Sequence, residues 1–141
     1  MDEQLKTMFM KVVRAQRSAV QKKLTEYNLY YGQPPILFCI QQHGKITQKE
    51  LAKKVDTSKE AMSITLKRLL NNGFIKKETD RVDRRLQLIS LSNKGEEVVK
   101  LCKENFAAVH QKMFKHLSKE QQLECIKLFE LMLMGLEKGE K

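Results

Sequence analysis

Residues 47–73 read TQKELAKKVDTSKEAMSITLKRLLNNG, and this stretch decides the fold. Thr47 and Glu50 have the spacing of a capping box, in which two side chains satisfy free backbone N–H groups at a helix start. Thr57 and Glu60 repeat the same spacing. The two boxes predict two helices, over residues 48–55 and 58–72, joined by a tight turn. Such a pair is a helix-turn-helix, whose second helix suits the DNA major groove.

The residues that follow have the pattern of a β-hairpin. Residues 74–79 and 86–91 alternate or run apolar as strands do, and the charged segment 80–85 joins them. A hairpin that directly follows a helix-turn-helix is a wing. We therefore expect residues 33–91 to form a winged helix-turn-helix DNA-binding lobe.

Further helices are expected on both sides of this lobe. Apolar residues recur at spacings of three and four over residues 3–26, and a second helix is expected from Pro34 to His43. After the lobe, Ser92 opens a long helix and Ser118 caps a last one. The predicted fold class is mainly α with a small β-wing.

The last helix is apolar around almost its whole circumference. It carries Leu128, Phe129, Leu131, Met132, Leu133, Met134 and Leu136. This is more apolar surface than the edge helix of a small monomer should expose. We therefore expect residues 1–32 and 92–141 to form a helical dimerisation lobe, and the 141-residue chain to be a single domain that forms a homodimer.

Charge favours a polyanionic partner. The chain has 27 Lys and Arg against 17 Asp and Glu, a formal net charge of +10. Residues 45–85 contain twelve of these cations and six acids, so this segment alone carries +6. Cations that neutralise phosphates release counterions, so binding should weaken steeply with salt. Double-stranded DNA is the expected partner.

The second helix of the pair has one face free of the apolar stripe. It presents Glu60, Ala61, Ser63, Ile64, Lys67, Arg68 and Asn71. A large apolar side chain has no structural reason to point to solvent, whereas contact with a thymine methyl group would use Ile64 and suit an AT-leaning site. The alternative is that Ile64 packs on the wing or is tolerated at the surface. For Glu60, a capping role is favoured over a hydrogen bond from cytosine.

Three stretches resemble motifs of the MarR (multiple antibiotic resistance regulator) family. They are TQKELA at residues 47–52, LLNNGFI at 69–75 and DRRLQLISLSNKG at 83–95. The most specific is the wing signature Asp83-x-Arg85, set before a strand and a Lys-Gly helix opening. The resemblance covers essentially the full chain. It implies a homodimer that reads successive grooves of a palindromic operator, and many members are repressors released by small aromatic or phenolic ligands.

The resemblance also assigns roles in the wing. Arg85 resembles the arginine that family members insert into the minor groove, and Asp83 the acid that orients it through a charge-assisted hydrogen bond. Arg81 and Arg84 are expected to neutralise the backbone or to probe the minor groove a second time. The full set of expected DNA contacts is Thr47, Gln48, Lys49, Ser58, Lys59, Ala61, Ser63, Ile64, Lys67, Arg68, Arg81, Asp83, Arg84 and Arg85.

Aromatic residues gather near the junction of the first two helices. Tyr27, Tyr31 and Phe38 lie where family ligands often bind, between the dimerisation and DNA lobes. They are candidates for a pocket that takes a small aromatic or phenolic effector. Packing at a hinge is the alternative.

No enzyme, metal site or cofactor is indicated. The histidines show no helical i, i+4 pairing, there is no Gly-rich phosphate loop, and Cys39, Cys102 and Cys125 form no nucleophile or zinc motif. Neither a signal peptide nor a membrane span is seen, so a cytoplasmic location without membrane attachment is expected. Two alternatives to a ligand-responsive repressor stay open: a winged-helix module that binds a protein partner, and a thiol redox-sensing regulator.

Overall fold

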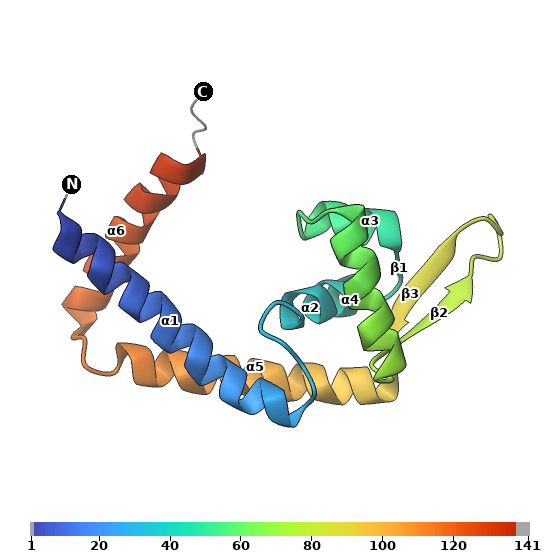
Figure 1. The fold of residues 1–141 in the computed structure, drawn as a ribbon, viewed down its shortest axis with the longest axis horizontal. Coiled ribbons are helices and arrows are strands. Elements are labelled where there is room, and N and C mark those ends of the chain that lie inside the picture. The colour runs from blue at the N-terminus through green and yellow to red at the C-terminus, as the bar shows by residue number, and fades with distance from the viewer. Residues whose placement is uncertain (1, 138–141) are drawn as a thin grey trace.

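A computed structural model describes residues 2–137 (Figure 1). The elements in chain order are α1 (Glu3–Glu26), α2 (Pro34–His43), β1 (Ile46–Thr47), α3 (Gln48–Lys54), α4 (Lys59–Asn71), β2 (Ile75–Thr79), β3 (Gln87–Leu91), α5 (Asn93–Phe114) and α6 (Lys119–Glu137). The fold is mainly helical with one small sheet, which confirms the predicted fold class.

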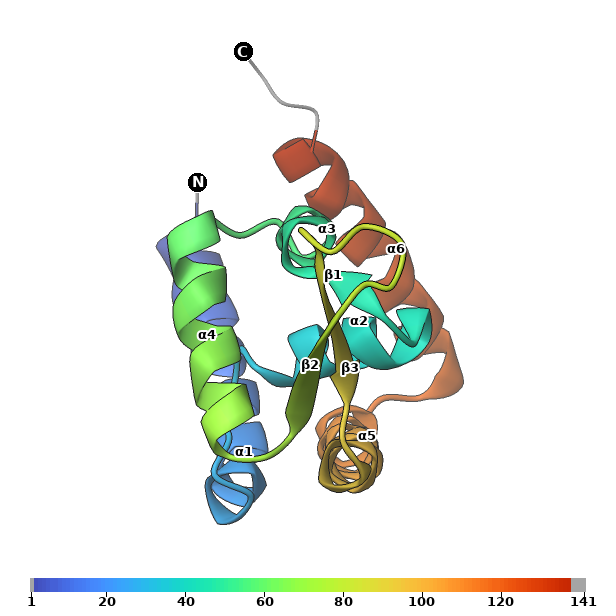
Figure 2. The same cartoon turned by 90° about the vertical axis from the view of Figure 1, so that its right-hand side faces the viewer.

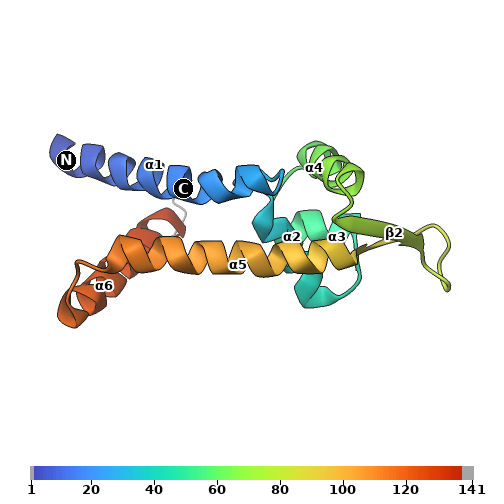
Figure 3. The same ribbon diagram turned by 90° about the horizontal axis from the view of Figure 1, so that it is seen from below.

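The molecule has two ends joined by a pair of long helices. Figures 1 and 3 show α1 and α5 running antiparallel, with α2, α3, α4 and the sheet at one end and α6 at the other. The buried Asn105 side chain ties the pair together, because its Nδ2 donates to the Val20 carbonyl oxygen at 3.1 Å. The winged lobe is thereby mounted on helices that continue to the opposite end.

The hydrophobic core lies inside the winged lobe and where α1, α2 and α5 meet. Its largest fully buried side chains are Val20, Leu24, Leu29, Leu37, Ile40, Ile46, Leu51, Met62, Leu66, Leu69, Ile89 and Val99. Burial of an aliphatic side chain of this size contributes roughly 1.5–3 kcal/mol. This core fixes the relative positions of the helix-turn-helix and the wing.

The wing belongs to a three-stranded antiparallel sheet of order β1-β3-β2. Thr79 pairs with Gln87 next to the hairpin loop, and Ile75 pairs with Leu91 at the base of the hairpin. Strand β1 was not predicted, because two residues are too few to show alternation; Ile46 pairs with Ile89. The hairpin itself was predicted, with each strand beginning one residue earlier than observed.

The first predicted capping box is confirmed. The Thr47 hydroxyl accepts from the Glu50 N–H at 3.2 Å, and the Glu50 carboxylate accepts from the Thr47 N–H at 3.3 Å. Helix α3 ends one residue earlier than predicted, with Val55 as its C-cap. The box also lowers the pKa of Glu50, chiefly through the hydrogen bond from the Thr47 side chain.

The second predicted capping box is wrong. Ser58, not Thr57, is the N-cap of α4, and its Oγ accepts from the Ala61 N–H at 3.1 Å. The turn shifts the start because Asp56 adopts a left-handed φ of 52° and the Thr57 N–H donates to the Ala52 carbonyl oxygen. Glu60 therefore has no capping role.

Many apolar residues are exposed in this single chain. On α1 only Val20 and Leu24 are buried, whereas Leu5, Met8, Phe9, Val12 and Val13 are exposed. Helix α6 has no buried residue. Leu70, Leu101 and Met113 are also exposed. Among residues 2–137, no helix is both long and apolar enough to cross a membrane.

Candidate nucleic-acid interface

Two elements of the winged lobe stand free for contact with a duplex. Figure 2 shows α4 at the left and the β2–β3 hairpin in the middle of the view, with α3 above α2 at the loop end of the hairpin. Met62, Leu66 and Leu69 anchor α4 in the core. This anchoring exposes the opposite face of the helix.

All seven residues predicted on that face are exposed. They are Glu60, Ala61, Ser63, Ile64, Lys67, Arg68 and Asn71. Arg68 is partly engaged already, since its guanidinium carbon lies 5.7 Å from the ring centroid of Tyr30 in the α1–α2 loop. The cations on this face give α4 the charge that phosphate contact requires.

An open hollow separates α3 from the first turns of α4. It is lined by Gln48, Lys49, Ala52, Lys59, Glu60, Ser63 and Ile64. Ile64 is 57% exposed and lines this hollow together with α3 residues. The alternative in which the wing covers Ile64 is thus wrong.

Two of the residues predicted to contact DNA, Thr47 and Ser58, cap the N-termini of α3 and α4. The Thr47 hydroxyl donates to the Glu50 carboxylate at 3.0 Å as well as accepting from the Glu50 N–H. The Ser58 hydroxyl caps α4. These two side chains therefore position α3 and α4, while Gln48, Lys49 and Lys59 extend from the same helix starts.

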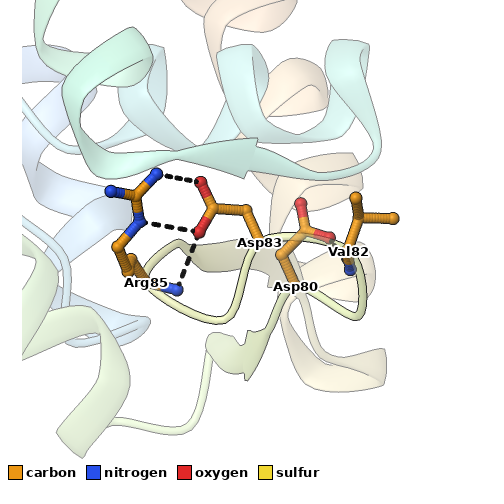
Figure 4. A network of polar contacts seen from close by, with 4 residues as sticks. All are labelled: Asp80, Val82, Asp83 and Arg85. Carbon is orange, nitrogen blue, oxygen red and sulfur yellow. Dashed lines mark hydrogen bonds and ion pairs between the residues drawn. The ribbon is translucent and has the colours of Figure 1, made fainter.

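The wing tip holds the predicted ion pair (Figure 4). Arg85 Nε donates to Asp83 Oδ1 at 3.0 Å and Nη2 donates to Oδ2 at 3.1 Å, while the Arg85 backbone N–H also donates to Oδ1. These bonds lower the pKa of Asp83 and raise that of Arg85. The Arg85 side chain is 89% exposed, so its charge is oriented but not covered.

The rest of the tip is held by local hydrogen bonds. Asp80 Oδ1 accepts from the Val82 N–H at 2.8 Å, and the Leu86 N–H donates to the Asp83 carbonyl oxygen at 3.0 Å. Arg81 and Arg84 are exposed. The hairpin therefore presents three arginines from an ordered turn.

The part of β2 near the hairpin loop is braced by an ion pair that sequence reasoning missed. Lys45 Nζ lies 2.7 Å from Glu78 Oε1, and this hydrogen bond is the main cause of the lowered pKa of Glu78. Lys45 lies before β1, whereas Glu78 lies on β2. No local spacing signals such a pair.

The C-terminal end of α4 is fixed to the start of α5 by a joint of Asn72, Gly73, Phe74, Ser92, Lys94 and Gly95. Lys94 Nζ donates to the Asn72 carbonyl oxygen at 2.7 Å, and Ser92 Oγ donates to that of Gly73. A Cβ placed on Gly95 would lie 2.0 Å from the Phe74 carbonyl oxygen. Residues of the LLNNGFI motif (69–75) and of the SNKG segment (92–95) therefore contact one another in the fold, which explains why the two motifs occur in the same sequence.

The aromatic candidates for an effector pocket pack among themselves and on the core. Tyr31 and Phe38 each meet the Phe106 ring edge-on, at centroid distances of 6.5 and 6.2 Å. The Tyr31 hydroxyl donates to Gln16 Oε1 at 2.8 Å, and Tyr27 packs against the same core. This arrangement fits hinge packing, the alternative stated for these residues.

One thiol lies beside an imidazole: Cys39 Sγ is 3.9 Å from His43 Nδ1, which also bonds to the Cys39 carbonyl oxygen at 2.9 Å. Cys102 is buried, and burial raises its pKa to about 11, so it stays protonated at neutral pH. The His110 ring lies between Phe106 and Phe114 and is tilted against both rings. Within residues 2–137 no three His, Cys, Asp or Glu side chains are grouped to hold a metal ion.

Comparison with known proteins agrees with this geometry. A sequence model of the MarR family matches residues 29–86. An uncharacterized HTH-type transcriptional regulator of Bacillus subtilis, YwhA, is 34% identical over 86 residues, which cover 61% of this chain and 62% of that protein. A Staphylococcus aureus relative, SAV2265, is 30% identical over 93 residues, covering 66% and 64%. The aligned parts thus span just under two thirds of these curated relatives.

Solved structures share the fold over nearly the whole chain. A crystal structure of MarR superposes with a TM-score of 0.73 at 28% identity, covering 95% of both chains. The S. aureus MepR–DNA complex gives a TM-score of 0.78 at 22% identity, covering 92% of this chain and 96% of that one. The motifs, the ion pair at the wing and the family model agree: residues 29–86 of this chain match the MarR family.

Proposed function

We propose that this protein is a transcriptional regulator that binds double-stranded DNA as a homodimer on a palindromic operator. The single observation that carries the proposal is the geometry of one lobe, where an exposed cationic helix face and an exposed, oriented Arg85 stand on separate elements of a rigid core. A helix in the major groove and an arginine in the adjacent minor groove would use both elements.

Two relatives of the same fold support this proposal by what they were crystallised with. The MepR structure described above is a complex with DNA, and a mutant of Escherichia coli MarR of TM-score 0.77 and 21% identity is complexed with operator DNA. We further propose repression as the output, release by a small aromatic or phenolic effector, and a cytoplasmic location. The half-buried Tyr31 and Phe38 between the two ends are the effector's candidate contacts.

The test is DNA binding by the purified protein at several salt concentrations, with random and palindrome-enriched duplexes. We expect selection of an inverted repeat with half-sites about 10 bp apart and a steep fall of affinity with salt. Arg85→Ala should weaken binding about tenfold or more, since one such contact contributes about 1–3 kcal/mol and each dimer makes two.

A second candidate function rests on the exposure of Ile64. An apolar side chain in a basic field would also suit a winged-helix module that binds a protein. The Arg85→Ala variant separates the two functions, because a hydrophobic protein contact at Ile64 should survive the loss of a wing arginine. Absence of DNA binding even at low salt would overturn the DNA-binding proposal.

A further inference from the structure

The hollow between α3 and α4 is lined by one apolar side chain that lies outside the core, that of Ile64. Ile64 is 57% exposed, whereas Met62 and Leu66 on the same helix are fully buried. Ala52 of α3 lines the same hollow. An exposed isoleucine and an alanine thus face the space into which a base pair would come if α4 entered the major groove.

The carboxylate of Glu60 favours the approach of base edges to this hollow over the approach of phosphates. It lies one helical turn before Ile64, lines the same hollow and has no capping role. Within residues 2–137 its carboxylate has no hydrogen-bond or ion-pair partner. A free carboxylate repels a phosphate but accepts a hydrogen bond from an exocyclic amine of adenine or cytosine. The middle of the hollow therefore suits base edges.

Two lysines supply the positive charge of the hollow. Lys49 and Lys59 line the hollow from the starts of α3 and α4. Both cations line the same hollow as Ile64, so they can neutralise phosphates of a duplex whose bases face Ile64. The hollow thus offers cations for the backbone and an apolar side chain for the bases.

We propose that this hollow takes the C5-methyl group of a pyrimidine, with Ile64 as the specificity-determining contact. The inference rests on the proposed DNA binding and adds which group is read. The C5-methyl is the apolar group that a base presents in the major groove. Thymine and 5-methylcytosine share it, and the second also carries the amine that suits Glu60.

The test measures DNA affinity for variants of the best-bound operator. In each variant, uracil replaces thymine at one position of both half-sites, so that one methyl group is removed from each half-site. At the contacted position uracil should weaken binding about fourfold for each half-site, the effect of one buried methyl group. Ile64→Ala should bind the two operators equally. Val82→Ala, which shortens an exposed apolar side chain on the wing, is the matched control and should keep the thymine preference.

A second arm identifies the source of the methyl group. With cytosine at the contacted position, its replacement by 5-methylcytosine should raise the affinity of the wild type but not of Ile64→Ala. A gain shows that the hollow accepts the methyl of either base, and no gain restricts it to thymine. A uracil effect that is absent at every position, or that persists in Ile64→Ala, overturns the inference. Loss of all DNA binding would instead overturn the proposed function.

Discussion

At the scale of single residues, the wing tip works through one carboxylate that accepts three hydrogen bonds from one arginine. Asp83 receives the Nε, Nη2 and backbone N–H groups of Arg85. A short side chain with this many acceptor positions can hold the guanidinium plane in one direction and leave its outer edge free. The wing therefore presents an arginine whose direction is set before DNA arrives.

This arrangement predicts the titration of Asp83. Hydrogen bonds from Arg85 lower the pKa of Asp83. The pair should therefore be complete above the ordinary pKa of an aspartate and be lost only as pH falls through the lower, folded-state value. In an NMR titration of the side-chain carboxyl carbons, the Asp83 midpoint should lie below that of an ordinary aspartate and return toward it in Arg85→Ala. An Asp83 midpoint unaffected by Arg85→Ala would contradict the pairing.

At the scale of elements, the joint between α4 and α5 sets how the recognition helix is aimed. Lys94 and Ser92 from the start of α5 bond to carbonyl oxygens at the end of α4, and Asn72 Nδ2 donates to the Asn28 carbonyl oxygen of the α1–α2 loop. The end of α4 is thereby attached to the start of α5 and to the loop that follows α1. A change in the angle between α1 and α5 would be transmitted to α4.

Gly95 lies against the Phe74 carbonyl oxygen, which is the closest backbone contact in the joint. Gly95→Ala should therefore lower the stability of the protein. A Cβ there would meet the Phe74 carbonyl oxygen at 2.0 Å, which the backbone must move to relieve. Overpacking of this kind costs about 1–3 kcal/mol, and we expect a loss of that size in urea unfolding. Gly32→Ala is the control, because a Cβ at Gly32 meets nothing within 4 Å. Equal stability of the two variants would show that the joint is loose.

The elements also show where sequence reasoning succeeds. Helix α1 was predicted with the observed bounds, α2 with proline in its first turn and its observed end at His43, and α3 to within one residue, because caps, prolines and apolar spacing are local signals. The box at Thr57 failed because the adjacent Ser58 offers an equivalent hydroxyl, and the left-handed Asp56 decides between them. The start of a helix thus depends on the turn before it as well as on its own spacing.

The residues of the candidate site likewise fall into those that could be predicted and those that only the folded chain brings together. The exposed face of α4 was predicted because residues one helical turn apart have a fixed relation, whereas the Asp83–Arg85 pair was predicted from the resemblance to the MarR family. The Lys45–Glu78 brace and the bond from Lys94 to the Asn72 carbonyl oxygen were not, since each joins segments that only the folded chain brings together. Glu60 was misjudged for a related reason, because an error of one residue in the cap gave it the wrong role.

At the scale of the whole molecule, the end opposite the winged lobe lacks a core of its own. Helix α6 has no buried residue, and Leu5, Met8 and Phe9 in the first half of α1 are exposed. The N-terminal half of α1 and helix α6 lie at the same end of the molecule (Figure 1). An apolar surface of this extent is typical of an interface. A second copy of the chain would cover it and would place two winged lobes on one duplex, as a palindromic operator requires.

A charge placed in this surface should therefore separate the dimer. Phe9→Glu and Phe129→Glu, made separately, each put an unpaired carboxylate where an apolar contact is expected, at a cost of about 2–5 kcal/mol. In sedimentation equilibrium the dimer dissociation constant should rise at least about thirtyfold, and binding to the palindrome should fall to that of a single half-site. Lys11→Glu, on an exposed polar position of α1, should leave the dimer intact. A wild type that stays monomeric at every concentration would contradict the homodimer. Dimers that survive both Phe substitutions would show that the interface lies elsewhere, and the exposed apolar faces of α1 and α6 would then have no explanation.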